Sequence, residues 1–398
     1  MTSPSPTTAT PSAATTTTSS IVPSDADAID LVFYLVREYS PSRHELPASR
    51  RLGERAAALG LHATVDDTGN FVASTHADPL RSSPEYRDIV LLGHIDTVPG
   101  EIQVRIDNGI LHGRGSVDAK GPLATFVIAA ARLRDRLPPG VRIVVIGAVE
   151  EETPTSRGAR AVVDRYQPIA CVIGEPSGTS GVTVGYKGRL VVRAEASRSL
   201  SHTAGPDRSA ADRVLAWWSR VQSRAATFAS ETPSPFRSLQ HSVRTMHAAD
   251  DGFTDRAELV AGFRLPPSVS PEQLKTVCLD EAGSDVSLTF VGAEVCFEAD
   301  PKSTLVRALT GAIREISPDT RPRILYKTGT SDMNVVGPAW RCPIAAFGPG
   351  DSALDHTPQE HLVLDEYLLA CRVLEQAVAR FASEAIPAAS IQGQINRS

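Results

Sequence analysis

The sequence contains little cysteine, and its cysteines are not arranged in pairs. Its 398 residues include five that are well separated and show no CxxC spacing: Cys171, Cys278, Cys296, Cys342 and Cys371. This pattern is typical of reduced thiols that pack as small hydrophobic side chains in a cytoplasmic protein. The sequence also lacks any run of 18 apolar residues, so we predict no transmembrane helix and no membrane partner.

Positive charge is also scarce. Forty Lys and Arg residues face 46 Asp and Glu residues, which gives a net charge of −6. This balance argues against a general role in binding nucleic acid or a membrane surface. A hydrophobic content of 41% with 22% charged residues is ordinary for a globular protein. The length predicts about two domains.

The first 20 residues, MTSPSPTTATPSAATTTTSS, contain no charged side chain and no apolar segment. A secretory signal needs both, and a transit peptide needs arginine, yet the first arginine is Arg37. We therefore predict that residues 1–23 form a disordered Ser/Thr/Pro-rich tail.

An apolar run followed by a histidine and an aspartate marks the first candidate site. The run Ile89–Leu92 predicts a strand, and His94 and Asp96 follow it closely. Asp118 comes shortly before Pro122, which opens a helical pattern. An imidazole and two carboxylates suit a metal such as zinc. From His94 and Asp96 alone, a surface histidine with loop-capping aspartates explains the pattern about equally well.

Three further apolar runs, 141–149, 170–173 and 343–347, also end at or near acidic or histidine residues. Helical segments separate the runs, which predicts an α/β fold with a mixed, largely parallel sheet flanked by helices. Ligands of such sheets bind beyond the carboxyl ends of the strands, so we predict a metal site there. The residues that follow these three runs are Glu150, Glu151, Glu152, Glu175, Asp355 and His356.

The pattern of predicted elements changes between residues 183 and 297, where strand-like stretches alternate with two amphipathic helices. We predict an inserted α+β lid or dimerisation domain at 183–297. It would interrupt a metal-binding catalytic domain formed by 24–182 and 298–385, and 386–398 would form a second flexible tail.

Six ordered motifs resemble those of the co-catalytic di-zinc aminoacylase and deacetylase family of metallopeptidases, which includes acetylornithine deacetylase and succinyl-diaminopimelate desuccinylase. The resemblance spans about residues 25–383. Within the family, it is greatest to hydrolases that release lysine or ornithine from an amino-group carrier protein. The motifs are GHIDTVP, GRGSVDAKG, the Glu triplet followed by RGAR, IGEPSG, KTGTSDMN and DHTPQE.

The resemblance implies two Zn²⁺ ions per chain, with Co²⁺ as a possible substitute. Asp118 would bridge the ions, His94 and Glu175 would complete one site, and Glu152 and His356 the other. Asp96 would orient His94, and Glu151 would act as the general base on a water that bridges the ions. The family usually has Asp-Glu-Glu where this chain has three glutamates. A register that uses Glu150 as the base and Glu151 as the ligand therefore stays open.

The resemblance also implies residues that contact the substrate. His202 matches a lid histidine that reaches across a homodimer, and Arg264 matches a lid arginine that binds a substrate carboxylate. A loop with backbone N–H groups and hydroxyls near the metals would complete the set. It comprises Lys327, Thr328, Gly329 and Thr330.

These features predict a metal-dependent amidohydrolase that releases lysine or ornithine from an N-blocked precursor in amino-acid biosynthesis. The precursor could be linked to an acidic carrier protein, as the resemblance implies, and residues 187–244 contain ten Lys or Arg but only four Asp or Glu. Arginines scattered over a helix and several strands with no shared face explain this surplus about equally well. The alternative in the same class is a deacetylase or desuccinylase of free small substrates. A metal-free binding protein of the same fold is the alternative in a different class.

Overall fold

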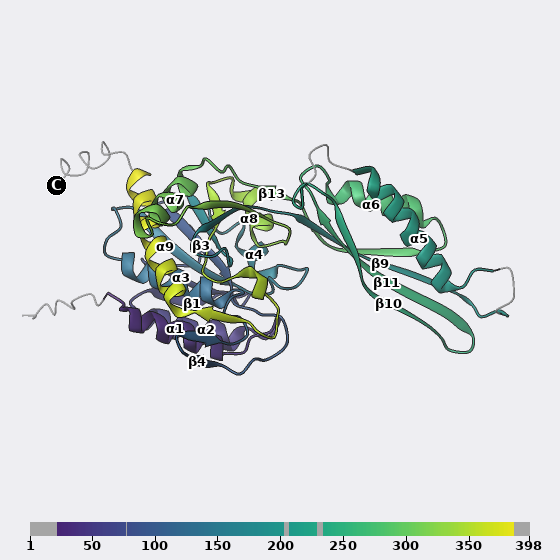
Figure 1. The fold of residues 1–398 in the computed structure, drawn as a ribbon, viewed down its shortest axis with the longest axis horizontal. Helices are drawn as coiled ribbons and strands as arrows, with labels where there is room; N and C mark the ends of the chain where they lie inside the picture. Colours follow the sequence, from purple (N-terminus) through teal and green to yellow (C-terminus); the bar gives the residue numbers. More distant parts are fainter. Residues whose placement is uncertain (1–21, 77, 203–206, 229–233, 386–398) are drawn as a thin grey trace, which may run out of the picture.

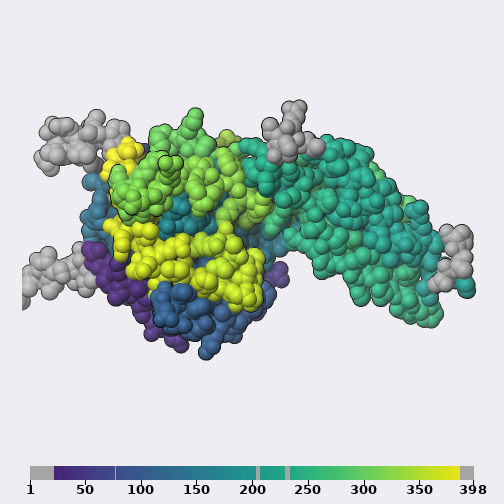
Figure 2. Space-filling model, in the orientation of Figure 1, coloured from purple at the N-terminus to yellow at the C-terminus, as the bar shows by residue number. Residues whose placement is uncertain are grey.

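Two large β-sheets lie in two separate bodies of the molecule (Figure 1). The computed structural model describes residues 22–76, 78–202, 207–228 and 234–385. The tails predicted at 1–23 and 386–398 lie outside these ranges, apart from Val22 and Pro23. Figure 2 shows the smaller body projecting from the larger one as a distinct lobe.

The larger body contains a nine-stranded sheet with the order β1-β2-β6-β3-β7-β15-β8-β13, and β14 also pairs with β8. Its central strands β6, β3, β7 and β15 run parallel to their neighbours in that group. This confirms the predicted mixed, largely parallel sheet. The strands are β1 (His62–Val65), β2 (Phe71–Ser74), β3 (Arg87–His94), β6 (Val141–Ala148), β7 (Ala170–Gly174), β8 (Gly181–Tyr186), β13 (Phe297–Glu298), β14 (Arg323–Lys327) and β15 (Ile344–Ala346).

Helices cover this sheet because its central strands are apolar on both faces. Every residue of α3 is buried, and it packs on β3, β6 and β7 while also contacting α1 and α9. Helices α4 and α8 contact each other and pack on β6 and β15, respectively. The helices are α1 (Asp25–Arg37), α2 (Leu46–Ala58), α3 (Lys120–Leu133), α4 (Arg157–Val162), α7 (Thr304–Ile316), α8 (Met333–Trp340) and α9 (Leu364–Glu384).

The smaller body is a four-stranded antiparallel sheet, ordered β10-β11-β9-β12, with two helices on one face (Figure 1). Trp217 lies in the core between sheet and helices, where its indole N–H donates to the carbonyl of Cys278. The elements are β9 (Gly188–Ser199), α5 (Ala210–Ala225), β10 (Gln240–Asp250), β11 (Thr254–Leu265), α6 (Pro271–Ala282) and β12 (Ser287–Glu294).

Shorter elements complete the chain. A three-stranded sheet is formed by β4 (Arg105–Asp107), β5 (Ile110–His112) and β16 (His361–Val363). Two 3-10 turns span Ala226–Phe228 and Ser352–Leu354. Among the helices in the described ranges, none has the length and apolar character needed to cross a bilayer.

Two details differ from the sequence analysis. Strand β8, which we had grouped with the insertion, pairs with β15, β13 and β14 in the larger sheet. Strand β10 was not predicted, because every one of its residues is exposed and no apolar alternation marks it. The division of the chain into domains at 183 and 297 stays a prediction.

Candidate metal centre

The central parallel strands place the candidate ligands at one edge of the sheet. Gly93 of β3 lies opposite Gly147 of β6 on one side and Gly174 of β7 on the other. The residues that follow these three glycines therefore emerge at the same level. They include His94, the glutamate triplet at 150–152, and Glu175.

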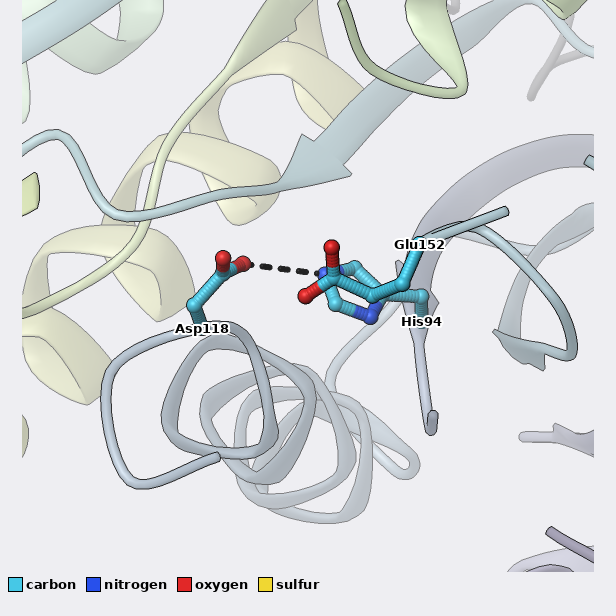
Figure 3. Close-up of side chains that lie close together, drawn as sticks. All are labelled: His94, Asp118 and Glu152. Atoms are coloured by element: carbon cyan, nitrogen blue, oxygen red, sulfur yellow. Dashed lines mark hydrogen bonds and ion pairs between the residues drawn. The ribbon is translucent and has the colours of Figure 1, made fainter. Parts of the chain in front are cut away.

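Asp118 lies immediately before α3 and points at two histidines. Its Oδ1 lies 3.1 Å from His94 Nε2, and its Oδ2 lies 3.0 Å from His356 Nε2. Oε1 of Glu152 lies 3.1 Å from the same nitrogen of His356. Ligand atoms of His94, Asp118 and Glu152 all lie within 4.8 Å of one another, which would suit a metal ion (Figure 3).

Asp96 lies behind this group and connects three segments. His94 Nδ1 lies 3.0 Å from the backbone carbonyl oxygen of Asp96 and 3.5 Å from its Oδ1. Its two carboxylate oxygens accept hydrogen bonds from the backbone N–H groups of Glu151 and Glu152, each at 3.1 Å. The hydroxyl of Ser42 donates a third at 2.7 Å. Asp96 thus orients His94 chiefly through its backbone carbonyl and positions the glutamate loop through its fully buried carboxylate.

The structure distinguishes the three glutamates. Glu150 adopts a φ of 59°, in the left-handed region, where the chain turns after β6. Its carboxylate accepts from Arg157 Nε at 2.7 Å and from the hydroxyl of Thr155 at 2.8 Å. Glu151 and Glu152 line the cavity beside Asp118. This geometry favours the register with Glu151 as the base and Glu152 as a ligand.

The negative charges of the carboxylates at this site are poorly compensated by positively charged groups of the protein. Burial, followed by the charges of neighbouring carboxylates, raises the pKa of Glu151 and Glu175 well above the ordinary range. Burial and the charge of Asp118 raise the pKa of Glu152, and they raise that of Asp355 to about 8. One buried oxygen of Asp355 has no hydrogen-bond partner among the described residues.

The pKa values of the two histidines are raised as well, which favours their charged form. Hydrogen bonds to Asp118 and Glu152 raise the pKa of His356 to about 11. Burial lowers the pKa of His94, but its bonds to Asp118 and Asp96 outweigh burial and raise it well above the ordinary value. Several buried carboxylates therefore share few cations, which is the charge pattern of a site for divalent metal ions. Nitrogen and oxygen donors are also the ligands that zinc accepts.

A cavity of about 420 Å³ opens between the metal-ligand candidates and the smaller body. Glu175 and His356 line it, so the five predicted ligands meet at this place. Of the predicted substrate contacts, Arg264, Lys327, Gly329 and Thr330 also line it. Arg264 donates a hydrogen bond of 2.6 Å to the hydroxyl of Thr330.

Two predicted contacts do not line this cavity. Thr328 is exposed and is not among the residues that line the cavity. His202 is also exposed, three residues beyond the end of β9. A strand rises about 3.3 Å per residue, so Ser199 at the end of β9 lies roughly 33 Å along the strand from Arg189, which does line the cavity, and His202 follows three residues later. Its predicted role across a homodimer stays a prediction.

Sequence reasoning missed several residues of the site. Glu360 accepts hydrogen bonds from the backbone N–H groups of Val117 and Asp118 and pairs with Arg114 at 2.7 Å, so it fixes the loop that carries Asp118. It ends the DHTPQE motif, which could have identified it. Arg189 and Arg244 line the cavity from the smaller body, and the sequence contains no local signal for either.

Residues 90–380 match the sequence model of Peptidase family M20/M25/M40, and the chain belongs to this family. The match confirms the predicted resemblance and the class of the protein, a metal-dependent hydrolase that acts on amide bonds. Among its relatives, the chain is 44% identical to the [LysW]-lysine hydrolase of Deinococcus radiodurans, covering 89% of this chain and 98% of the relative. It is 38% identical to a putative [LysW]-lysine/[LysW]-ornithine hydrolase of Thermococcus kodakarensis, over 89% and 92%.

Solved structures show the same fold at low sequence identity. The M20 family metallo-carboxypeptidase Sso-CP2 of Sulfolobus solfataricus aligns with a TM-score of 0.74 at 16% identity, covering 89% of this chain and 99% of that one. The YXEP protein of Bacillus subtilis, described as a dinuclear metal-binding peptidase of the M20 family, aligns with a TM-score of 0.63 at 13% identity, covering 91% and 98%.

Proposed function

We propose that this protein hydrolyses the amide that joins lysine or ornithine to an amino-group carrier protein, as a step in amino-acid biosynthesis in the cytoplasm. The observation that supports this most strongly is the 44% identity to a [LysW]-lysine hydrolase over nearly the full length of both chains. The cavity beside the candidate ligands supplies an acid–base group and cationic side chains for such a substrate.

In this proposal, His94, Asp118, Glu152, Glu175 and His356 hold two Zn²⁺ ions, for which Co²⁺ could substitute. When bound, such ions polarise an amide carbonyl and make a water more acidic. Glu151 takes the proton from the attacking water and then delivers it to the leaving amine. Asp96 keeps His94 in the orientation and tautomer that a metal requires.

The metal assignment has a direct test. Asp118 reaches both histidines, so Asp118→Ala should remove both ions, whereas His356→Ala should mainly weaken one. Metal content after dialysis, measured by mass spectrometry, gives the answer. Two full equivalents of zinc in Asp118→Ala would contradict the bridging role.

The carrier requires a docking surface, and most of the basic residues that we expected to form one are paired with carboxylates. Seven of the ten basic residues counted at 187–244 form ion pairs with carboxylates that lie outside that window. Over the whole stretch 183–297, thirteen Lys and Arg residues balance thirteen Asp and Glu residues. The excess of positive charge is therefore confined to residues 187–244. The proposal that an acidic carrier docks on this protein is supported by the similarity to the relatives and not by a net positive charge of the predicted lid.

An activity panel tests the proposed function. We expect kcat/KM to be highest for carrier-linked lysine or ornithine and far lower for acetyl-ornithine, acetyl-lysine and succinyl-diaminopimelate. Efficient turnover of the free small substrates, together with inactivity on the carrier-linked ones, would instead establish the small-molecule deacetylase or desuccinylase.

A further inference from the structure

The two sheets are joined by two short stretches of backbone that lie against each other. Strand β8 leads into β9 through Lys187, and β12 leads back to β13 through Val295 and Cys296. A Cβ atom at Gly188 would stand 2.7 Å from the backbone nitrogen of Cys296 and 2.9 Å from the carbonyl carbon of Val295. The two connections therefore pack backbone against backbone, and the missing side chain of Gly188 allows this close approach.

One side chain binds both connections. The carboxamide NH₂ group of Asn334, in α8, donates to the carbonyl oxygens of Tyr186 and Lys187 at 3.2 Å each and to that of Val295 at 2.8 Å. Its two protons serve three acceptors, so one proton is shared. The reverse orientation of the amide would set an oxygen against three carbonyl oxygens, so the nitrogen faces them. Only 3% of Asn334 is exposed, which shields these bonds from water.

The same side chain also holds the predicted substrate loop, residues 327–330. Its Oδ1 accepts from the backbone N–H of Ser331 at 3.0 Å, directly after the loop. The preceding residue, Thr330, accepts the hydrogen bond of 2.6 Å from Arg264 of the smaller body. At the start of the loop, the carbonyl of Lys327 accepts from the backbone N–H of Lys187 at 3.3 Å. The placement of the loop and that of the smaller body therefore depend on one carboxamide.

The cavity needs both bodies in register, because Arg264 lines it from the smaller body, whereas Glu151 and Thr330 line it from the larger one. We propose that Asn334 is a positioning residue of this hydrolase. By binding both connections and the end of the substrate loop, it holds the smaller body where Arg264 meets Thr330 across the cavity. The inference rests on the proposed function. Asn334 is not among the residues that line the cavity, so it acts through the groups that it holds.

Asn334→Ala tests this role in the zinc-loaded enzyme. We expect kcat/KM to fall about 10- to 100-fold at unchanged zinc content, because a misplacement of about 1 Å around a substrate can cost about 100-fold in rate. Asn334→Gln keeps the amide on a longer side chain and should lose less. The substrates are carrier-linked lysine and acetyl-lysine, and all variants are compared on the one that the wild type cleaves faster. Rates within about threefold of the wild type in both variants would overturn the inference.

Tyr367→Phe is a matched control for a loss of stability alone. Tyr367 lies on α9, and its buried hydroxyl donates to the carbonyl of Ala28 in α1 at 3.0 Å. The variant therefore also leaves a buried backbone carbonyl without its partner, but at neither connection between the bodies. It should unfold at a lower denaturant concentration and keep the kcat/KM of the wild type.

A double-mutant cycle separates positioning from a purely structural role. Thr330→Val removes the hydroxyl that Arg264 contacts and keeps the shape of the side chain. If Asn334 acts by maintaining this contact, Asn334→Ala should cost much less in the Thr330→Val background than in the wild type. Equal fold-losses in the two backgrounds would refute the positioning role. If Asn334→Ala does not fold, Asn334→Gln takes its place in the cycle.

Hydrogen exchange measured by mass spectrometry separates this inference from the proposed function, because it requires no substrate. In Asn334→Ala the backbone amides of Lys187 and Ser331 should exchange faster, whereas those of α3 should keep their wild-type rates. If the zinc-loaded wild type cleaves neither substrate, the proposed function fails. Unchanged exchange at both amides would refute the role of Asn334 whatever the substrate is.

Discussion

At the scale of single residues, the buried carboxylate of Asp96 shows how the site is assembled. Its two oxygens accept hydrogen bonds from both backbone N–H groups of the loop after β6 that carries Glu151 and Glu152. The backbone carbonyl of Asp96 lies 3.0 Å from Nδ1 of His94, the last residue of β3. A ligand and the proposed base are therefore positioned by the same residue, so an error in either position would be transmitted to the other.

The proposed base gives the first prediction. Glu151→Gln should retain the fold and the metal but lose about 10²- to 10⁴-fold in turnover, because an amide cannot relay the proton. Steady-state rates and circular dichroism measure the two effects. The matched control is Glu150→Gln, whose side chain binds Arg157 instead of lining the cavity and should have a much smaller effect on rate. A larger loss of turnover in Glu150→Gln than in Glu151→Gln would show that the register is shifted by one residue.

Protonation of the histidines gives the second prediction. In the metal-free protein the pKa of His356 is raised to about 11, and that of His94 is raised well above its ordinary value. Both therefore carry a proton at pH 7.5, and a metal must displace it to reach the ring nitrogen. Zinc binding should release protons from these histidines and from Glu175 and Glu152, whose pKa values are also raised, and the apparent affinity should rise with pH from 6 to 8.

Calorimetric titrations in two buffers with different ionisation enthalpies measure this release. His361→Gln serves as the control, because His361 lies on β16 and its Nδ1 contacts the carbonyl of Gln359. That variant should release as many protons as the wild type. Zinc binding with no proton release at pH 7.5 would contradict the ion pairs seen around Asp118.

At the scale of elements, the ends of the central strands set the separation of the ligands. Gly93 and Gly174 face each other where β3 and β7 end, and each directly precedes a candidate ligand. A Cβ atom at Gly174 would lie 2.9 Å from Phe126 of α3 and 3.0 Å from the Cα of Gly93. The close approach of strand, strand and helix therefore depends on the missing side chain.

Gly174→Ala should accordingly destabilise the fold by about 1–3 kcal/mol, the usual cost of overpacking a core, and should weaken metal binding by moving His94 and Glu175 apart. Gly53→Ala is the control. Gly53 lies inside α2, and a Cβ atom there would meet no other atom within 4 Å, so alanine should stabilise by about 0.5–1 kcal/mol. Denaturant unfolding and zinc affinity of both variants check this. A Gly174→Ala protein of unchanged stability and affinity would refute the packing argument.

The elements also show how far sequence reasoning extends. The apolar runs that form β3, β6, β7 and β15 were predicted nearly to their ends, because strands buried on both faces are continuously apolar. The candidate ligands follow these ends directly and were therefore identified as well. Strand β10 escaped because it is an exposed edge, and β8 was misplaced because only its long-range pairing assigns it to the larger sheet. The position of Arg244 at the cavity also depends on the pairing of β10 with β11, which shifts beside it in a β-bulge, because such a bulge cannot be recognised from the sequence of one strand alone.

At the scale of the whole molecule, the two bodies pose a question about His202. The cavity lies where the smaller body joins the larger one, whereas β9 carries the chain away from it toward His202 (Figure 1). The end of β9 lies roughly 33 Å along the strand from Arg189 at the cavity, so this histidine, three residues further on, is too far away to touch a substrate in its own chain. If it contacts substrate as the family resemblance implies, it must do so in the cavity of a second copy, in a symmetric homodimer.

Mixing two inactive variants tests this arrangement. Glu151→Gln has a defective base, and His202→Ala would have a defective contribution to its partner. In a mixed dimer, the site with an intact Glu151 would also receive an intact His202, so random exchange of subunits should restore about a quarter of wild-type activity. Unfolding and refolding the variants together provides the exchange, and light scattering checks the dimer. If His202 acted within its own chain, both sites of the mixed dimer would keep one defect, and activity would not return.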